Sequence, residues 1–184
     1  MFRFPPKQDA LLHSGYATCA ELCENFAKDM KPLYLLAFLL TGRHAVAERC
    51  FLATLDDCIR PNRVFKGWER SWSKRCLISN AIHLVFSGPA ESGGKPDSWS
   101  GVDVESGECS GLNALTGLTP PLQRFVLVMS VLERYSEREC ALLLRCALRD
   151  VAEARVHGLQ QLSSFNSIAD QDSTTKRNLR VAAN

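Results

Sequence analysis

Residues 136–162 carry the residue types and spacing of a helix-turn-helix, the helix pair that reads base edges in the major groove of DNA. Ser136 and Glu139 match the S-x-x-E capping box, which predicts a helix that begins at Glu137. Ala141 is small enough to let the two helices approach closely. The positions that the motif fills with apolar groups hold Cys140, Leu144, Cys146, Val151 and Ala154.

The same stretch also fits an ordinary helical hairpin, and the residues leave both interpretations open. The turn position that usually holds glycine is Arg145, which would cost about 1 kcal/mol in a left-handed conformation. Ala147 stands where the second helix would have a serine-type N-cap, a loss of about 1 kcal/mol. Charge does not distinguish the helix-turn-helix from an ordinary hairpin, because residues 119–162 contain six arginines against five acidic residues.

A second group with potential chemistry is His13, Cys19 and Cys23 near the N-terminus, which could form a zinc site or a thiol sensor. The sequence has eight cysteines and no secretory signal, so we expect free thiols. No second cysteine or histidine pair completes a zinc site, so we predict neither a metal nor a cofactor. We do not expect an enzyme, because no phosphate loop, nucleophile elbow or paired-carboxylate motif occurs.

Composition bounds the setting of these groups. The 184 residues are 46% hydrophobic and 23% charged, which is typical of a soluble globular protein with one domain or two small ones. The net charge of +2 gives no overall basic field, so any nucleic acid must bind a local patch. The longest apolar run, at residues 32–40, is shorter than the roughly 20 residues that span a bilayer. Without a signal peptide either, the expected location is the cytoplasm.

The elements that must position these residues are helices, and we predict an all-α fold. Helical periodicity runs almost throughout residues 17–86, and strand-like alternation stands out nowhere. Gly42 and Pro61 supply natural helix stops in this first block. Its four helices are expected over residues 22–30, 32–42, 46–59 and 64–86.

Residues 87–117 differ in composition from the blocks on either side. They are rich in glycine, serine and acidic residues, with a local charge of −4, and we predict a flexible acidic linker. A second helical block follows at 118–162, with Thr119 as its N-cap and Pro120 in the first turn. The remaining segments are an N-terminal extension, 1–16, and a polar tail, 163–184, which is expected to fray.

Matching motifs occur in the same order in one known protein family. The first block matches its region two at Leu40, Thr41, Gly42, Ala47, Glu48, Phe65, Trp68, Asn80 and Ile82. The second matches the opening of region four at Leu118, Pro120, Pro121, Arg124, Ser136, Glu139, Ala141 and Leu144. The chain thus resembles a divergent bacterial RNA polymerase sigma factor of the extracytoplasmic-function type, in the sigma-70 family, over residues 24–86 and 118–162.

The resemblance implies that the protein recognises promoter DNA and separates its strands, and that it catalyses no bond-making chemistry. Its expected partners are core RNA polymerase, promoter DNA and an anti-sigma protein, with no membrane and no cofactor. Residues 60–80 contain six Lys or Arg and one acidic residue, and in the family this region holds unpaired bases by stacking and by backbone contacts. Burial of both tryptophans in the core is the alternative. The implied DNA-binding residues here are Lys66, Trp68, Arg70, Trp72, Lys74 and Arg75.

In the region-four-like block, the resemblance implies that the second helix enters the major groove. Arg149 is the candidate reader of guanine, and Glu153 could accept from cytosine. Arg155 and His157 are placed to touch phosphate, as is Arg138 from the first helix. For each of these side chains, a solvated surface charge is the alternative.

The polymerase contact implied by the resemblance falls at Glu48, Arg49 and Leu52. The family places acidic and glutamine residues after the Ala47-Glu48 pair, whereas this chain has Arg49, Leu52 and Ala53. This departure keeps a second interpretation open, in which a sigma-like regulator has lost polymerase binding and acts through other protein contacts.

Overall fold

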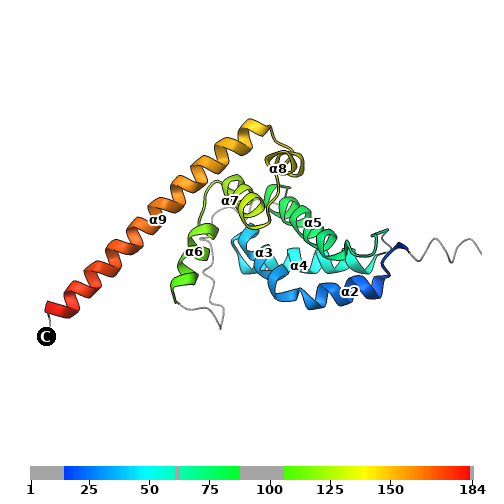
Figure 1. Ribbon diagram of the computed structural model, residues 1–184, viewed down its shortest axis with the longest axis horizontal. Helices are drawn as coiled ribbons and strands as arrows, with labels where there is room; N and C mark the ends of the chain where they lie inside the picture. The colour runs from blue at the N-terminus through cyan, green and yellow to red at the C-terminus, as the bar shows by residue number, and fades with distance from the viewer. Residues whose placement is uncertain (1–14, 61–62, 88–105, 183–184) are drawn as a thin grey trace, which may run out of the picture. The chain divides into compact units, whose positions relative to one another are not determined.

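The computed structural model describes residues 15–60, 63–87 and 106–182, with side chains at all of these except 106–110 and 166–182. The predicted all-α fold is confirmed, since the described residues form helices and turns and contain no strand (Figure 1). One isolated bridge pairs Tyr16 with Phe65. Within these ranges, no helix combines the length and the apolar character needed to cross a membrane. The chain divides into two compact units, one within residues 1–90 and the other within 91–184.

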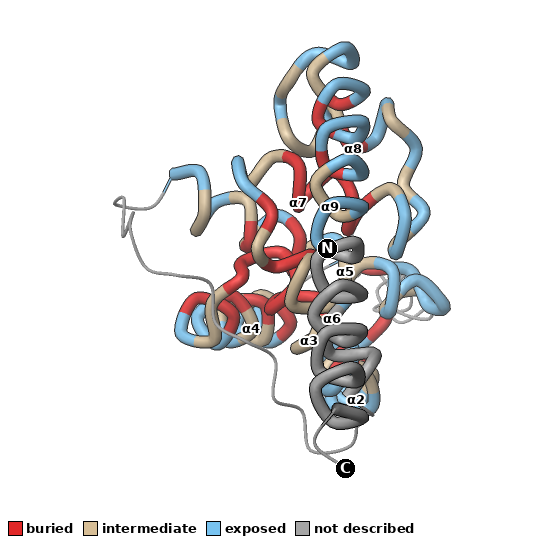
Figure 2. The backbone as a smooth tube through the Cα atoms, turned by 90° about the vertical axis from the view of Figure 1, so that its left-hand side faces the viewer, coloured by how far each residue is buried: buried red, intermediate tan, exposed pale blue. Residues whose placement is uncertain are grey.

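The first unit contains α2 (Cys19–Lys28), α3 (Met30–Thr41), α4 (His44–Ile59) and α5 (Glu69–Ile82), which continues as a π-helical turn, η2 (His83–Ser87). The most buried helix is α3, which packs against α4 and α5 and is therefore apolar around most of its surface. Gly42 ends α3 as expected, with a φ of 69°. The core of this unit, red in Figure 2, includes Leu22, Phe26, Leu33, Phe38, Leu40, Cys50, Leu77 and Ile78.

Two predicted helix positions in this unit are wrong. The apolar stripe of the first helix was expected to reach Met30, but α2 ends before Asp29 and the Met30 side chain is exposed. The fourth helix was expected from residue 64, but α5 begins at Glu69. Residues 63–68 are instead a loop with Gly67 at a φ of 87°, a conformation that glycine adopts without strain.

The second unit contains α6 (Ser106–Thr116), α7 (Pro121–Leu127) with its π-helical continuation η3 (Val128–Leu132), α8 (Glu137–Leu144) and α9 (Leu148–Ala182). Two segments differ from expectation. The C-terminal part of the predicted linker 87–117 is helical, as α6, while residues 88–105 lie outside the described residues. The tail was expected to fray, but α9 continues through it to Ala182.

The central element of this unit is α7, which is buried from Gln123 to Leu127 and packs against α9. Gly158 lets α9 approach closely, since a Cβ there would lie 2.7 Å from Leu127 Cδ1. The buried Arg124 donates from Nη1 to the Thr116 carbonyl at 2.9 Å, which ties α7 to the end of α6. Burial lowers the pKa of Arg124 to about 10. The N-cap of α7 is Pro120 rather than the predicted Thr119.

Candidate nucleic-acid interface

The loop before α5 presents aromatic rings at the surface of the first unit. Trp68, directly before the first residue of α5, is 68% exposed, so the alternative that it lies in the core is wrong. Trp72, one turn further along, is half-buried. Phe65 is 57% exposed and stacks on Tyr16 with ring centroids 4.8 Å apart. Two exposed rings from one short loop therefore offer faces on which bases could stack.

Two of the predicted cations beside these rings form ion pairs with acidic side chains from the region of α2. Lys66 Nζ lies 3.1 Å from Glu21 Oε1, and Arg70 Nε lies 2.8 Å from Asp29 Oδ2. Lys74 is half-buried and Arg75 is exposed. Part of the positive charge in this stretch is thus already balanced within the unit, although exposed pairs of this kind are weak and open at low cost.

Glu21 is held in place by more than its ion pair. Its carboxylate accepts from the Thr18 backbone N–H at 2.7 Å, and Glu21 N donates to Thr18 Oγ1 at 3.2 Å, which completes a capping box. The Thr18 backbone N–H, followed by Lys66, lowers the pKa of Glu21. The segment before α2 also binds the loop through its backbone, because Ala17 N donates to Val64 O at 2.7 Å. The start of α2 therefore positions the loop that carries Phe65.

The sequence interpretation did not place Tyr16, Glu21 or Asp29 at this surface, and it named Phe65 only as a motif match and not as a site residue. The T-x-x-E pattern at residues 18–21 is a capping-box signal that could have placed the start of α2. No local signal relates Glu21 to Lys66 or Tyr16 to Phe65, because these contacts exist only once α2 packs beside the loop.

In the second unit, residues 136–162 form two helices joined by a short turn, with the predicted capping box in place. Ser136 N donates to Glu139 Oε2 at 2.8 Å, and Glu139 N donates to Ser136 Oγ at 3.3 Å. Arg145 does adopt the left-handed conformation, at φ 53° and ψ 43°. Ala147 lacks a capping side chain, but its N–H donates to Asp150 Oδ2 at 3.1 Å, which supplies the missing acceptor.

The apolar positions of this helix pair are only partly buried. Cys140, Val151 and Ala154 are buried, as the motif requires. Leu144 and Cys146 are half-buried. The helix pair therefore has a small core of its own, which sets the second helix against the first and leaves the opposite face of α9 exposed.

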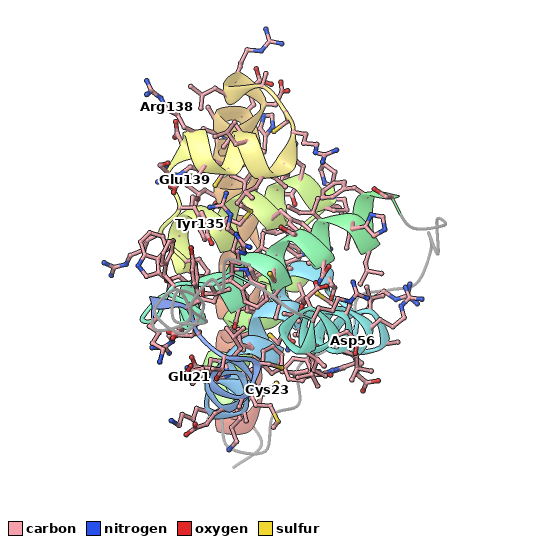
Figure 3. The ribbon with its side chains drawn as sticks, turned by 90° about the vertical axis from the view of Figure 1, so that its right-hand side faces the viewer. Glu21, Cys23, Asp56, Tyr135, Arg138 and Glu139 are labelled. Carbon is pink, nitrogen blue, oxygen red and sulfur yellow. The ribbon has the colours of Figure 1, made fainter. Side chains whose placement is uncertain are left out.

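All five residues predicted to contact DNA from this unit have exposed side chains. The Arg149 side chain is 82% exposed, and its Nε lies 3.6 Å from Glu153 Oε1 one turn along α9. Arg155 Nη1 lies 3.3 Å from Glu137 Oε1 on α8. Arg138 projects outward from α8, near Glu139 and Tyr135 (Figure 3). His157 completes the set.

The predicted polymerase contact lies on an exposed face of α4. Glu48 and Arg49 are exposed, and Leu52 is 58% exposed. Their spacing places them on one side of the helix, with Asp56, labelled in Figure 3, one turn further along. A single exposed leucine is common on protein surfaces, so the resemblance, and not the exposure of Leu52, points to this face.

The candidate zinc or thiol group is only partly described, because His13 lies outside the described residues. Among the side chains that the structure places, no three histidine, cysteine or acidic residues are arranged to hold a metal ion. Cys19 and Cys23 do lie one turn apart on α2. The Cys58 carbonyl, on α4, lies 3.6 Å from Cys19 Sγ. Burial raises the pKa values of Cys50, Cys58 and Cys76 to about 12, 11 and 12.

The two candidate surfaces bring together different side chains. The first unit combines exposed aromatic rings with a basic stretch, and the second presents arginines on a capped helix pair.

The sequence matches no model of a known protein family, and a search of curated proteins finds no match.

Proposed function

We propose that this protein is a DNA-binding transcription initiation factor of the sigma type, which joins core RNA polymerase and recognises promoter DNA. The observation that carries this function is the exposed Trp68, with the exposed Phe65 in the same loop, within the most basic stretch of the chain. A protein that holds a separated DNA strand needs aromatic faces for the bases and cations for the backbone. Both occur here within one loop and the first turns of one helix.

The second unit contributes the proposed contact with duplex DNA. Arg149 is the second residue of α9, and the N-terminal residues of a recognition helix are those that reach base edges. Its fork of donors matches guanine O6 and N7. The Glu153 partner costs little to displace, because both side chains of the pair are largely exposed.

The exposed face of α4 is the proposed polymerase contact, with Leu52 at its centre and Glu48 and Arg49 beside it. An anti-sigma protein would compete for such surfaces. The factor would act in the cytoplasm, together with the polymerase.

The test is co-purification of the full-length protein with bacterial core RNA polymerase, followed by run-off transcription from a library of genomic fragments. Leu52→Asp is expected to weaken polymerase binding, because it places a charge at the apolar centre of the contact. Met30→Asp is the matched control, since Met30 is an exposed apolar residue of the same unit outside that face. The absence of a complex at micromolar protein would contradict the function.

A second candidate is a sigma-like regulator that has lost polymerase binding and acts through protein contacts. It is favoured by the charge of the helix pair, because residues 136–157 contain four arginines against four acidic residues and phosphate neutralisation supplies most non-specific affinity. The same pull-down separates the two candidates. Tight association with a partner other than polymerase, without promoter binding, would support the regulator and exclude the initiation factor.

A further inference from the structure

The first two turns of α2 carry two thiols, and the first of them lies next to the end of another helix. Cys19 is the first residue of α2 and is exposed, and Cys23, labelled in Figure 3, follows one turn later and is half-buried. Side chains four residues apart lie on the same face of a helix, so Cys19 and Cys23 are neighbours on α2. Cys19 Sγ also lies 3.6 Å from the Cys58 carbonyl and 3.5 Å from the Ile59 carbonyl, at the C-terminal end of α4.

We propose that Cys19 and Cys23 are a redox modification site, which forms a reversible disulfide when the protein meets a hydroperoxide. Cys19 is set apart from the buried thiols of this unit by its exposure, and Cys23 is its neighbour on the same helix. Cys50 and Cys58 are buried, and desolvation keeps them protonated, whereas the reactive form of cysteine is the thiolate. Cys19 is the only exposed thiol among the described cysteines, so it is the first to meet an oxidant.

The reaction requires one hydroperoxide for each disulfide. The Cys19 thiolate attacks the outer oxygen of the peroxide, which releases an alcohol, or water from hydrogen peroxide, and leaves a sulfenic acid on Cys19. The Cys23 sulfur then attacks the Cys19 sulfur and displaces the hydroxyl group as water, taking up the thiol proton. Two thiols are oxidised by two electrons in all, and the peroxide is reduced by the same two. A dithiol reductant reverses the bond.

A disulfide between these positions is incompatible with an intact first turn. Residues four apart on a helix have Cβ atoms about 5–6 Å apart, whereas a disulfide needs about 3.5–4.5 Å. The helix end must therefore deform, and Cys19 is the residue that moves because it is the first residue of α2. Its sulfur then leaves the carbonyls at the end of α4.

Deformation at the start of α2 is expected to affect the loop that precedes α5, because the two segments are joined by hydrogen bonds and an ion pair. Ala17, two residues before Cys19, donates to Val64 O, and Lys66 N donates to Gly15 O at 3.1 Å. Glu21, in the same turn of α2, pairs with Lys66. Oxidation is thus expected to loosen residues 63–66, the segment that holds Phe65 in place.

The experiment treats the reduced full-length protein with hydrogen peroxide, blocks the remaining thiols by alkylation and maps peptides by mass spectrometry. Cys19 and Cys23 fall in one tryptic peptide, residues 8–28, which is expected to lose two hydrogen atoms and to escape alkylation. Hydrogen exchange is then compared before and after oxidation. The amides of Ala17 and Lys66 are expected to exchange about fivefold faster, the effect of losing one N-cap interaction.

Cys23→Ser is the test variant and Cys76→Ser the matched control, since Cys76 is a half-buried thiol of the same unit. After oxidation, the control is expected to contain the disulfide and to show faster exchange at Ala17 and Lys66. The test variant is expected to show neither change. A linkage between any other pair of cysteines, or a disulfide without faster exchange at Ala17 and Lys66, would overturn the inference. Every measurement uses the protein alone, so its failure would leave the proposed function untouched.

Discussion

The basic stretch of the first unit and the helix pair of the second hold their arginines and lysines in different ways. In the first, the balancing carboxylates come from outside the stretch, because Glu21 and Asp29 reach Lys66 and Arg70 from either end of α2. In the helix pair the carboxylates belong to the pair itself, as in the bond between Arg149 and Glu153. The ion pairs of Lys66 and Arg70 can open when α2 moves relative to the basic stretch. The pair of Arg149 and Glu153 lies within one helix, so movement of that helix leaves it unchanged.

The two regions also differ in what surrounds the charges. Trp68 and Phe65 are exposed aromatic rings beside an excess of cations, a combination suited to unpaired bases. The exposed apolar residues of the helix pair are aliphatic, and the most exposed, Leu142, is 78% accessible. With equal numbers of arginines and acidic residues, this region should bind phosphate weakly. Under the proposed function, this difference fits strand holding by the first unit and base reading by the second.

The largest expected effect concerns whether the two units are separate folding bodies. Phe38→Ala and Phe125→Ala each remove a fully buried ring, and each is expected to cost about 3–5 kcal/mol of unfolding free energy. Because each ring lies in the core of one unit, hydrogen exchange should show lost protection in that unit alone. Loss of protection in both units from either variant would show one cooperative body and break the comparison.

A smaller effect is expected for single-stranded DNA. Trp68→Ala removes an exposed ring and should weaken binding of an oligonucleotide by about 1–3 kcal/mol, the contribution of stacking one base. Fluorescence anisotropy of a labelled oligonucleotide at fixed salt concentration measures this change in binding free energy. Met30→Ala, which removes an exposed apolar side chain from the same unit, should leave affinity unchanged. Equal losses in the two variants would argue against a stacking role for Trp68.

The turn of the helix pair can be improved without touching its proposed contacts. Arg145→Gly removes the strain of a left-handed non-glycine residue and is expected to stabilise the second unit by about 1 kcal/mol. Urea unfolding measures this gain. Arg138→Gly, inside α8, should instead destabilise by about 1 kcal/mol, since glycine is a poor helix former. A loss of stability at position 145 would show that the arginine side chain matters more than its backbone strain.

The smallest expected effect is on how the unfolding free energy of the first unit depends on pH in acid. The pKa of Glu21 is lowered from 4.5 in the folded state, so its contribution to stability is present above pH 4.5 and is lost as pH falls through the lowered value. Glu21→Gln should therefore make unfolding of this unit less dependent on pH below 4.5. Glu24→Gln, which removes an exposed carboxylate of the same helix, is the control and should change this dependence less.

Local signals in the sequence predicted much of the backbone. The capping box at Ser136 and Glu139 and the helix stop at Gly42 both act within a few residues, so their outcome is nearly independent of the rest of the fold. The left-handed conformation of Arg145 counted against the helix-turn-helix because of its cost, yet the structure adopts it. The all-α class follows from the same short-range periodicity. Composition misled where it suggested a coil at 106–116 and fraying beyond residue 162, because glycine and polar residues weaken a helix without forbidding it.

By itself, then, the sequence determined that this chain forms capped helices, where several of them stop, and which stretch is most basic. Only the tertiary structure decided that Trp68 lies outside the core, that α2 supplies the carboxylates for Lys66 and Arg70, and that Cys19 meets the end of α4. The physical reason is range. A cap or a turn is settled by neighbours along the chain, whereas the exposure of a ring and the partner of a charge depend on which helices pack together.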